Sequence, residues 1–153
     1  MARYGKPFKF IPKNPQKYIG DVDKIIMRST WERKFAIWCD LNPSVIAWNS
    51  EGIPIPYFHK VNGKIHNYYV DFFVKLTTKT GEIKKLAVEV KPKCETEPPK
   101  VPKRKTQKSQ QNYLTECLTY QRNKDKWESA QEWCKKNGFE FVILTEYELG
   151  IKK

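Results

Sequence analysis

Three ionisable residues on two neighbouring extended segments form the pattern in this sequence that is best suited to chemistry. Asp71 lies in the apolar run Tyr68 to Leu76, and Glu89 and Lys91 lie in the run Lys85 to Lys91. Because side chains alternate along a strand, Glu89 and Lys91 point to the same face. If the two runs pair as a hairpin, Asp71 approaches Glu89 closely enough for both to bind one divalent cation. A cation held by two carboxylates beside a lysine is suited to phosphodiester hydrolysis.

Each of these residues also has a simpler interpretation. Glu89-x-Lys91 is a common tripeptide pattern, and a surface ion pair of this kind contributes little to stability. The segment Ser29 to Glu32 matches a capping box at the start of a helix, in which Glu32 would accept a hydrogen bond from the Ser29 backbone N–H. The competing interpretation directs Glu32 into a metal site with Asp71. The local sequence leaves both interpretations open.

The composition points to a polyanionic partner. The chain has 153 residues, with 29 Lys and Arg against 17 Asp and Glu, and a formal net charge of +12. An excess of this size favours nucleic acid, which is bound through phosphate contacts and counterion release. Ribosomal and DNA-coating proteins have the same property, so charge indicates a partner and not an activity. The length and the aromatic content of 14% fit a single domain with a substantial core.

Several other classes are disfavoured. The four cysteines lack C-x-x-C spacing, and the two histidines are seven residues apart, so we expect no zinc site; these residues are Cys39, Cys94, Cys117, Cys134, His59 and His66. No segment has the length of a membrane span, and the N-terminus lacks the apolar core of a signal peptide. We therefore expect an intracellular protein with reduced thiols and no membrane partner.

The first part of the chain predicts an arm followed by a helix. Residues 1–28 are basic and rich in proline, without a helical or strand period, and predict an extended arm lying on the domain or on DNA, or disorder in its first ten residues. A single domain is expected over residues 29–153. It opens with a helix on which Trp31, Phe35 and Trp38 share a face.

The helix is expected to end at Asn42-Pro43, and strands and turns follow. The predicted order is a strand at Val45 to Trp48, a turn at Asn49 to Gly52, an edge strand containing Pro54 and Pro56, and a hairpin turn at Asn62-Gly63 that joins residues 57–61 to one long strand over residues 64–76.

A basic loop rich in proline and lysine is expected over residues 92–112. It is either simply solvated or, because it leaves the Glu89 strand directly, placed to follow a DNA backbone. Its basic residues should contact phosphates without reading base sequence; they are Lys100, Lys103, Arg104 and Lys105.

The remainder predicts helix, strand and helix. A break in the apolar phase near Asn123 indicates a kink or two separate helices, ending at Gly138. A buried strand over residues 139–145 and a short helix over residues 146–151 should follow. The whole order predicts a mixed sheet with helices on it, an α/β or α+β fold.

The order of a helical Glu, a hairpin Asp and a Glu-x-Lys strand resembles the PD-(D/E)xK nuclease superfamily, and the matching residues here are Glu32, Asp71, Glu89 and Lys91. Flanking motifs narrow the resemblance, among them Asn14-Pro15, Arg28-Ser29-x-x-Glu32, Trp48-x-Ser50-Glu51, Glu89-x-Lys91-Pro92 and the Phe-x-Ile-Leu-Thr-Glu strand ending at Glu146. Together they look like the head-completion nuclease family of contractile-tailed phages, whose core is similar to the TnsA-type transposon endonucleases. The resemblance covers almost the whole chain.

The resemblance implies a restriction-endonuclease-like mixed central sheet flanked by helices. It implies DNA cleavage with Mg²⁺, or Mn²⁺ as a substitute, after packaging and before tail joining. Asp71, Glu89 and Glu32 would then bind the metal, with the Val90 carbonyl as an added ligand. Lys91 would orient the attacking water or offset charge on the phosphorane.

Further residues receive weaker assignments from the resemblance. Gln121 and Lys126 lie where relatives place DNA-contacting side chains on a helix, with an ordinary surface role as the alternative. Ser50, Glu51 and Tyr57 are assigned either to the surroundings of the metal or to strand edges, and a structural role is favoured for Tyr57. His66 is assigned to a phosphate contact or to packing, and not to the metal. The superfamily usually has proline before the motif Asp, whereas this chain has Val70, which leaves the direction of Asp71 open.

The implied partners are double-stranded DNA and the head and neck (connector) proteins of a phage. The implied location is the host cytoplasm during assembly, with retention in the virion as an alternative. Two other functions stay open: a DNA-binding structural head or neck protein with vestigial cleavage activity, and an endonuclease of the same fold in transposition or repair.

Overall fold

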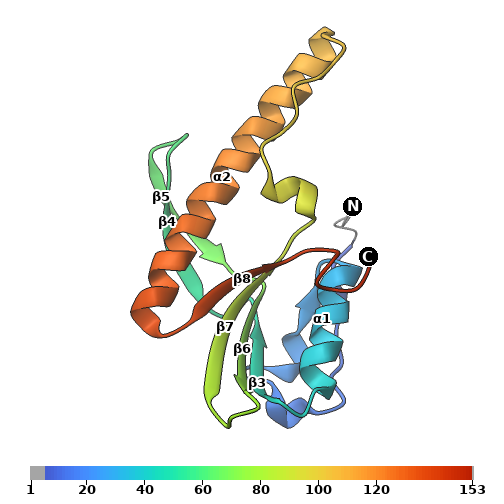
Figure 1. The fold of residues 1–153 in the computed structure, drawn as a ribbon, viewed down its shortest axis with the longest axis vertical. Helices are drawn as coiled ribbons and strands as arrows, with labels where there is room; N and C mark the ends of the chain where they lie inside the picture. The colour runs from blue at the N-terminus through green and yellow to red at the C-terminus, as the bar shows by residue number, and fades with distance from the viewer. Residues whose placement is uncertain (1–5, 153) are drawn as a thin grey trace.

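A four-stranded mixed sheet forms the centre of the protein, for which a computed structural model describes residues 6–152. Its strands lie in the order β3-β6-β7-β8 (Figure 1) and are β3 (Val45–Ser50), β6 (Phe72–Thr77), β7 (Ile83–Val90) and β8 (Glu140–Leu144). The β3/β6 and β6/β7 pairs are antiparallel, while β7 and β8 are parallel. The predicted fold class, a restriction-endonuclease-like mixed sheet flanked by helices, is confirmed.

One face of the sheet packs against helix α1 (Thr30–Leu41). Alternation along the strands directs Phe72 and Val74 of β6 and Val88 of β7 to this side, where they meet Phe35 of α1. The helix begins at the predicted cap, since the Ser29 hydroxyl accepts a hydrogen bond from the Glu32 N–H at 3.1 Å. It ends where expected, with Asn42 as the C-terminal cap.

The described part of the predicted N-terminal arm, residues 6–28, lies on this same layer. Two short strands, β1 (Phe8–Lys9) and β2 (Ile26–Met27), pair with each other, and two 3₁₀ turns, η1 (Pro15–Lys17) and η2 (Val22–Lys24), separate them. Phe10, Ile25 and Met27 are buried in the α1-side core. These residues are therefore an integral layer of the domain; residues 1–5 lie outside the described part.

The Lys17 side chain ties this segment to α1. Its ammonium donates to the carbonyl oxygens of Cys39, Asp40 and Asn42 at 2.7, 3.0 and 2.8 Å. A helix leaves its last carbonyl groups without partners in the helix, and a cation placed there also complements the negative end of the helix dipole. The Asp40 carboxylate in turn accepts from the backbone N–H groups of Lys13 and Asn14.

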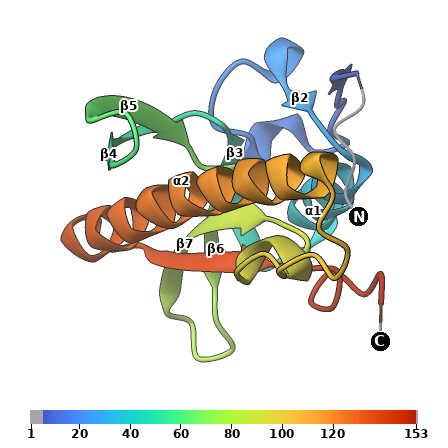
Figure 2. The same ribbon diagram turned by 90° about the horizontal axis from the view of Figure 1, so that it is seen from above.

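The opposite face of the sheet carries helix α2 (Gln107–Asn137) and a hairpin of β4 (Pro54–His59) and β5 (Lys64–Tyr69), which lie beside each other (Figure 2). Phe73 and Ala87 point to this side of the sheet and pack with Trp127 of α2. The Asn62-Gly63 turn closes the hairpin as predicted, and the strand with Pro54 and Pro56 pairs only with β5 among the described strands.

The predicted long strand over residues 64–76 is wrong, because it divides into β5 and β6 at Val70 and Asp71. The two strands belong to different sheets. Val70 turns into the core on the α2 side, where it is fully buried. The chain thus changes direction between β5 and β6 at a buried valine, where the resemblance implied a proline.

The predictions for α2 were wrong in two respects. The loop ends at Thr106 and not at residue 112, because Thr106 and Ser109 form a reciprocal capping box. The helix then continues past Asn123 without a break. The change of apolar phase has another cause: the first half projects from the sheet, leaving Leu114 and Leu118 exposed, whereas the second half lies on it (Figure 1).

The predicted helix over residues 146–151 is also wrong. The segment forms turns in which the N–H of Leu149 bonds to the Thr145 carbonyl and that of Gly150 to the Tyr147 carbonyl. Gly150 adopts a φ of 73°, which interrupts a right-handed helix. None of the helices within residues 6–152 combines the length and the hydrophobicity needed to cross a membrane.

The unequal burial of the two halves of α2 predicts unequal effects of truncation. We expect Trp127→Ala to lower the free energy of unfolding by about 3 kcal/mol, because it leaves a cavity against the sheet. Leu114→Ala, on the projecting half of the same helix, should change it by less than about 0.5 kcal/mol. Urea denaturation followed by circular dichroism measures both, and equal losses would contradict the packing described above.

Candidate metal centre

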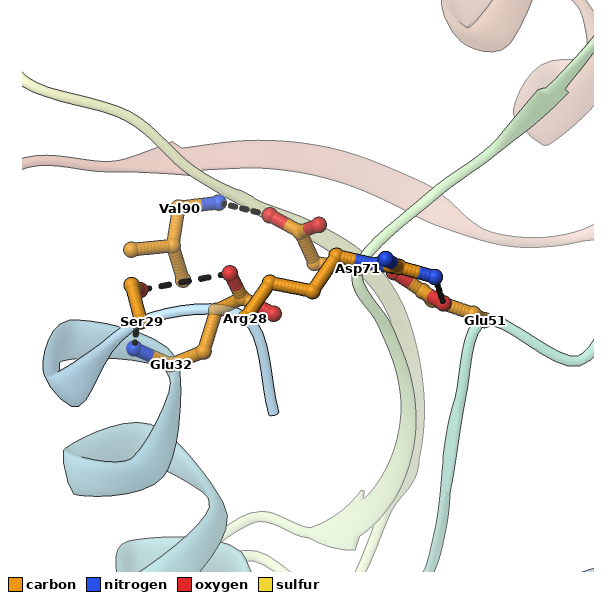
Figure 3. Close-up of polar contacts among 6 residues, drawn as sticks. All are labelled: Arg28, Ser29, Glu32, Glu51, Asp71 and Val90. Atoms are coloured by element: carbon orange, nitrogen blue, oxygen red, sulfur yellow. Dashed lines mark hydrogen bonds and ion pairs between the residues drawn. The ribbon is translucent and has the colours of Figure 1, made fainter. Parts of the chain in front are cut away.

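Three carboxylates from separate parts of the chain converge where β3 and β7 end and β6 begins, at one end of the strands of the central sheet (Figure 3). One carboxylate oxygen each from Glu32, Glu51 and Asp71 lies within 4.8 Å of the others. Glu32 is in the first turn of α1, Glu51 follows β3, and Asp71 lies between β5 and β6. We call these three residues the carboxylate trio.

The helix cap positions Glu32. The Ser29 hydroxyl accepts from the Glu32 N–H and donates to the Glu32 carboxylate at 3.2 Å. The Glu32 carboxylate is thus bonded by the Ser29 hydroxyl, and also by the Arg28 backbone, where the sequence predicted the Ser29 backbone N–H. Capping and a position in the trio, which the sequence presented as competing interpretations, occur together.

A backbone N–H at the end of β7 fixes the direction of Asp71. The Val90 N–H donates to Asp71 Oδ2 at 2.8 Å. The Asp71 carbonyl meanwhile accepts from the Glu51 N–H at 3.1 Å, which joins the two ends of the β4–β5 hairpin. Asp71 therefore points toward Glu32 and Glu51 with Val70, and not a proline, before it.

Glu51 reaches the trio through an unusual backbone conformation. It is the non-glycine residue with positive φ, 49°, in the described part of the chain. A Cβ at Gly52 would lie 1.9 Å from Asn49 Oδ1, so any other residue there would displace the Asn49 side chain, which donates to the Ile19 carbonyl. Sequence reasoning assigned Glu51 only to the surroundings of the site or to a strand edge; its local sequence predicts a turn and carries no signal that the turn faces Glu32 and Asp71.

Arg28 is a resident cation beside the trio that the sequence-based assignments did not include. Its guanidinium forms a two-point ion pair with Glu51, with Nε–Oε1 at 2.8 Å and Nη2–Oε2 at 3.2 Å (Figure 3). The hydrogen bond to Glu51 raises the pKa of Arg28, and the charges of Glu32 and Asp71 act in the same direction. The guanidinium thus offsets part of the negative charge of all three carboxylates.

Glu89 lies close by but outside the trio. It alternates along β7 with Val88 and Val90, which face α1, and so points toward the α2 side. Glu89 is only 6% exposed, and its Oε2 has no hydrogen-bond partner. A buried carboxylate oxygen without a partner is costly unless a cation meets it.

Two lysines supply positive charge near these carboxylates. The charge of Lys91 lowers the pKa of both Asp71 and Glu89. Lys126 of α2 also acts on Glu89, and its ammonium lies 5.9 and 5.5 Å from the ring centres of Tyr57 and Tyr68. Burial lowers the pKa of Lys126.

The protein environment opposes ionisation of the carboxylates. Burial, followed by the charge of Glu32, raises the pKa of Asp71 to about 8. Burial raises the pKa of Glu89 to about 8 and also raises that of Glu32. A bound divalent cation would reverse this effect. The oxygen-only donor set is the kind that Mg²⁺ and Mn²⁺ prefer, so the residues fit such a metal.

The other residues assigned from the sequence occupy separate places. The structure brings Glu32 and Asp71 together with Glu51, and the Val90 N–H donates to Asp71. Gln121 donates to Asp125 Oδ1 at 2.9 Å. The predicted phosphate contacts are exposed on the loop between β7 and α2, which runs along the projecting half of α2 (Figure 1); they are Lys100, Lys103, Arg104 and Lys105.

Comparison of the sequence with known proteins identifies the family of this chain. A family model described as TnsA-like endonuclease N terminal matches residues 42–146. The head completion nuclease of Enterobacteria phage T4 is 43% identical over 138 residues, which span 90% of this chain and 89% of that protein. The chain therefore belongs to the family of TnsA-like endonucleases that includes the phage head completion nuclease.

Proposed function

We propose that the protein is a Mg²⁺-dependent DNA nuclease that hydrolyses phosphodiester bonds during phage head completion, before heads join tails. The convergence of Glu32, Glu51 and Asp71 within 4.8 Å carries this proposal, because three carboxylates held so close can share one divalent cation, which offsets their mutual repulsion. The relative from phage T4, named a head completion nuclease, supports the biological role.

The trio would hold the metal, with Glu89 as a further ligand toward the α2 side. When bound, a divalent cation polarises the phosphate and lowers the pKa of the attacking water. The chain's own residues do the rest. The Ser29 cap and the Val90 N–H fix the directions of Glu32 and Asp71 before substrate arrives, so no reorganisation is needed during the reaction.

Lys91 is the residue best placed to act on the phosphate. Its charge acts on both Asp71 and Glu89, so its ammonium is near both carboxylates. There it would orient the attacking water or offset the charge developing on the phosphorane oxygens. Arg28 and Lys126 add positive charge on either side of the site.

DNA would be held by the basic surface of a chain with a net charge of +12. The exposed loop residues contact phosphates away from the site and so add affinity without sequence readout; they are Lys100, Lys103, Arg104 and Lys105. Lys126 contacts DNA nearer the site, and Gln121 would use its second amide N–H or its amide oxygen, since one N–H bonds to Asp125. Head and neck proteins would bring the enzyme to its substrate in the host cytoplasm.

Cleavage of plasmid DNA tests the proposal. We expect the wild-type protein to nick or degrade plasmid with Mg²⁺ or Mn²⁺ and to stop when EDTA is added. Asp71→Asn, Glu51→Gln and Lys91→Met should each lower the rate about 10²-fold or more. The first two remove a carboxylate that would hold the metal, and the third removes a positive charge that would stabilise the transition state. Glu132→Gln, an exposed residue on α2, is the matched control and should cleave normally.

Two outcomes would count against this assignment. If the three variants kept the wild-type rate, the site would be elsewhere. If the wild-type protein bound DNA in a salt-dependent manner but never cut it with either metal, a structural head or neck protein with vestigial activity would be the better description.

The raised pKa of Glu89 predicts a pH effect on the metal-free protein. Its folded-state pKa, about 8, lies above the ordinary value of 4.5, so between these values the folded protein binds a proton that the unfolded chain does not. The resulting stabilisation is fully present below pH 4.5 and is lost as the pH rises through about 8.

Glu89→Gln should remove this loss. In EDTA at pH 8.5 the variant should be more stable than the wild-type protein by roughly 1–3 kcal/mol, whereas at pH 5 the two should be nearly equal. Urea denaturation at both pH values measures the difference, with Glu132→Gln as control. A difference that did not depend on pH would contradict burial of an ionisable Glu89.

A further inference from the structure

The β4–β5 hairpin has one buried face and one exposed face. Ile55, Tyr57 and Tyr68 are buried in the α2-side core. The outer face carries Phe58, Ile65 and Tyr69, which are 53%, 74% and 49% exposed. A strand usually places polar side chains on its solvent face, so an apolar outer face indicates a surface that binds something.

The register makes this outer face continuous. Phe58 pairs with Ile65, Pro56 with Asn67, and Pro54 with Tyr69. Side chains of paired residues on one face lie next to each other across the strands. The three pairs therefore form an apolar ladder, with one polar rung, that runs along the hairpin; we call it the hairpin ladder.

The hairpin ladder begins at the carboxylate trio. The hairpin is inserted between Glu51 and Asp71, which lie just before β4 and just after β5. The Glu51 N–H bonds to the Asp71 carbonyl at 3.1 Å and closes the base of the hairpin. Whatever occupies the trio therefore lies next to the Pro54/Tyr69 end of the ladder.

The charge of the hairpin favours a polyanion. Residues 52–70 contain no Asp or Glu, but they contain Lys60, Lys64, His59 and His66. Lys60 forms ion pairs with Asp125 and Glu128 of α2, at 3.5 and 3.7 Å, whereas Lys64 is exposed at the start of β5. A second copy of this cationic chain on the ladder would bring like charges together, while DNA would bring phosphates to Lys64.

We propose that the hairpin ladder binds DNA beside the scissile phosphate, with Phe58, Ile65 and Tyr69 against sugars and bases. Lys64 pairs with His59 on the other face of the hairpin, next to the turn, and its long side chain would reach round this end of the hairpin to a phosphate. This inference rests on the proposed nuclease function. Two-stranded β-ribbons enter DNA grooves, and apolar or aromatic side chains bind base and sugar surfaces without sequence readout. The hairpin would thus add affinity for the DNA that lies next to the trio.

Binding measured without cleavage tests the inference. In Ca²⁺ buffer, with a fluorescent 30-base-pair duplex and anisotropy as the readout, Phe58→Thr/Ile65→Thr should raise Kd about 10-fold or more. Threonine keeps the strand preference, so the hairpin should remain folded, as circular dichroism and thermal melting would verify. Ile83→Thr, an equally exposed apolar strand residue on the β6–β7 hairpin, is the matched control and should bind normally.

Two further measurements separate the contacts. Lys64→Gln should reduce the slope of log K against log salt concentration by about 1, whereas the Phe58/Ile65 variant should leave the slope unchanged. With Mg²⁺ at saturating DNA, single-turnover cleavage by the Phe58/Ile65 variant should stay within about twofold of the wild-type rate, because the ladder does not touch the reacting atoms. The same variant with a single-stranded probe shows which form of DNA the ladder binds.

The failure of this inference differs from the failure of the proposed function. A folded Phe58/Ile65 variant with wild-type Kd for both probes would overturn the inference even if the wild-type protein cleaves. Conversion of a dimer to a monomer in sedimentation, with Kd unchanged, would also overturn it and identify a second copy as the occupant. A wild-type protein that binds DNA but never cleaves it would contradict the nuclease assignment. A raised Kd for the Phe58/Ile65 variant would still support the ladder as a DNA-binding surface.

Discussion

Repulsion among buried carboxylates is the constraint on which this structure depends. A chain with a net charge of +12 gathers Glu32, Glu51, Asp71 and Glu89 at one end of the strands of its sheet, where burial raises the pKa of three of them. Without compensation such a cluster would protonate or open. Arg28, Lys91 and the Val90 N–H provide compensation within the chain, and a divalent cation would complete it.

The elements around the site can be understood as the means of holding these charges together. A helix start supplies Glu32 already fixed by its cap, and a strand end supplies the N–H that orients Asp71. The left-handed conformation of Glu51 turns its carboxylate back toward both. Since β7 lies inside the sheet, the strand that carries Glu89 and Val90 is hydrogen-bonded to a neighbour on each side, β6 and β8. Preorganisation of this kind is what a hydrolytic site requires.

The sequence predicted the parts of this site that follow from short-range rules. The cap at Ser29 fixed the place of Glu32 at the start of α1, and the Asn62-Gly63 turn identified the hairpin. Alternation along a strand gave the face of Glu89. The resemblance then joined Glu32, Asp71, Glu89 and Lys91 into one hypothesis, and the family it named is confirmed.

Long-range geometry was beyond sequence reasoning. Nothing in Asn49 to Gly52 shows that this turn faces the first turn of α1, so Glu51 was not recognised as a third carboxylate. The apolar run through Val70 hides the transfer of the chain from one sheet to another. The continuity of α2 was missed because its two halves have different surroundings, one against the sheet and one projecting from it.

Crystallography with Mn²⁺ tests the central claim most directly. An anomalous difference map from a crystal soaked in Mn²⁺ should show a peak bound by oxygens of Glu32, Glu51 and Asp71, at about 2.1–2.2 Å. Glu51 should then have exchanged at least one of its bonds to Arg28 for the metal. A peak located away from these three carboxylates, with the Arg28–Glu51 ion pair intact, would contradict the account.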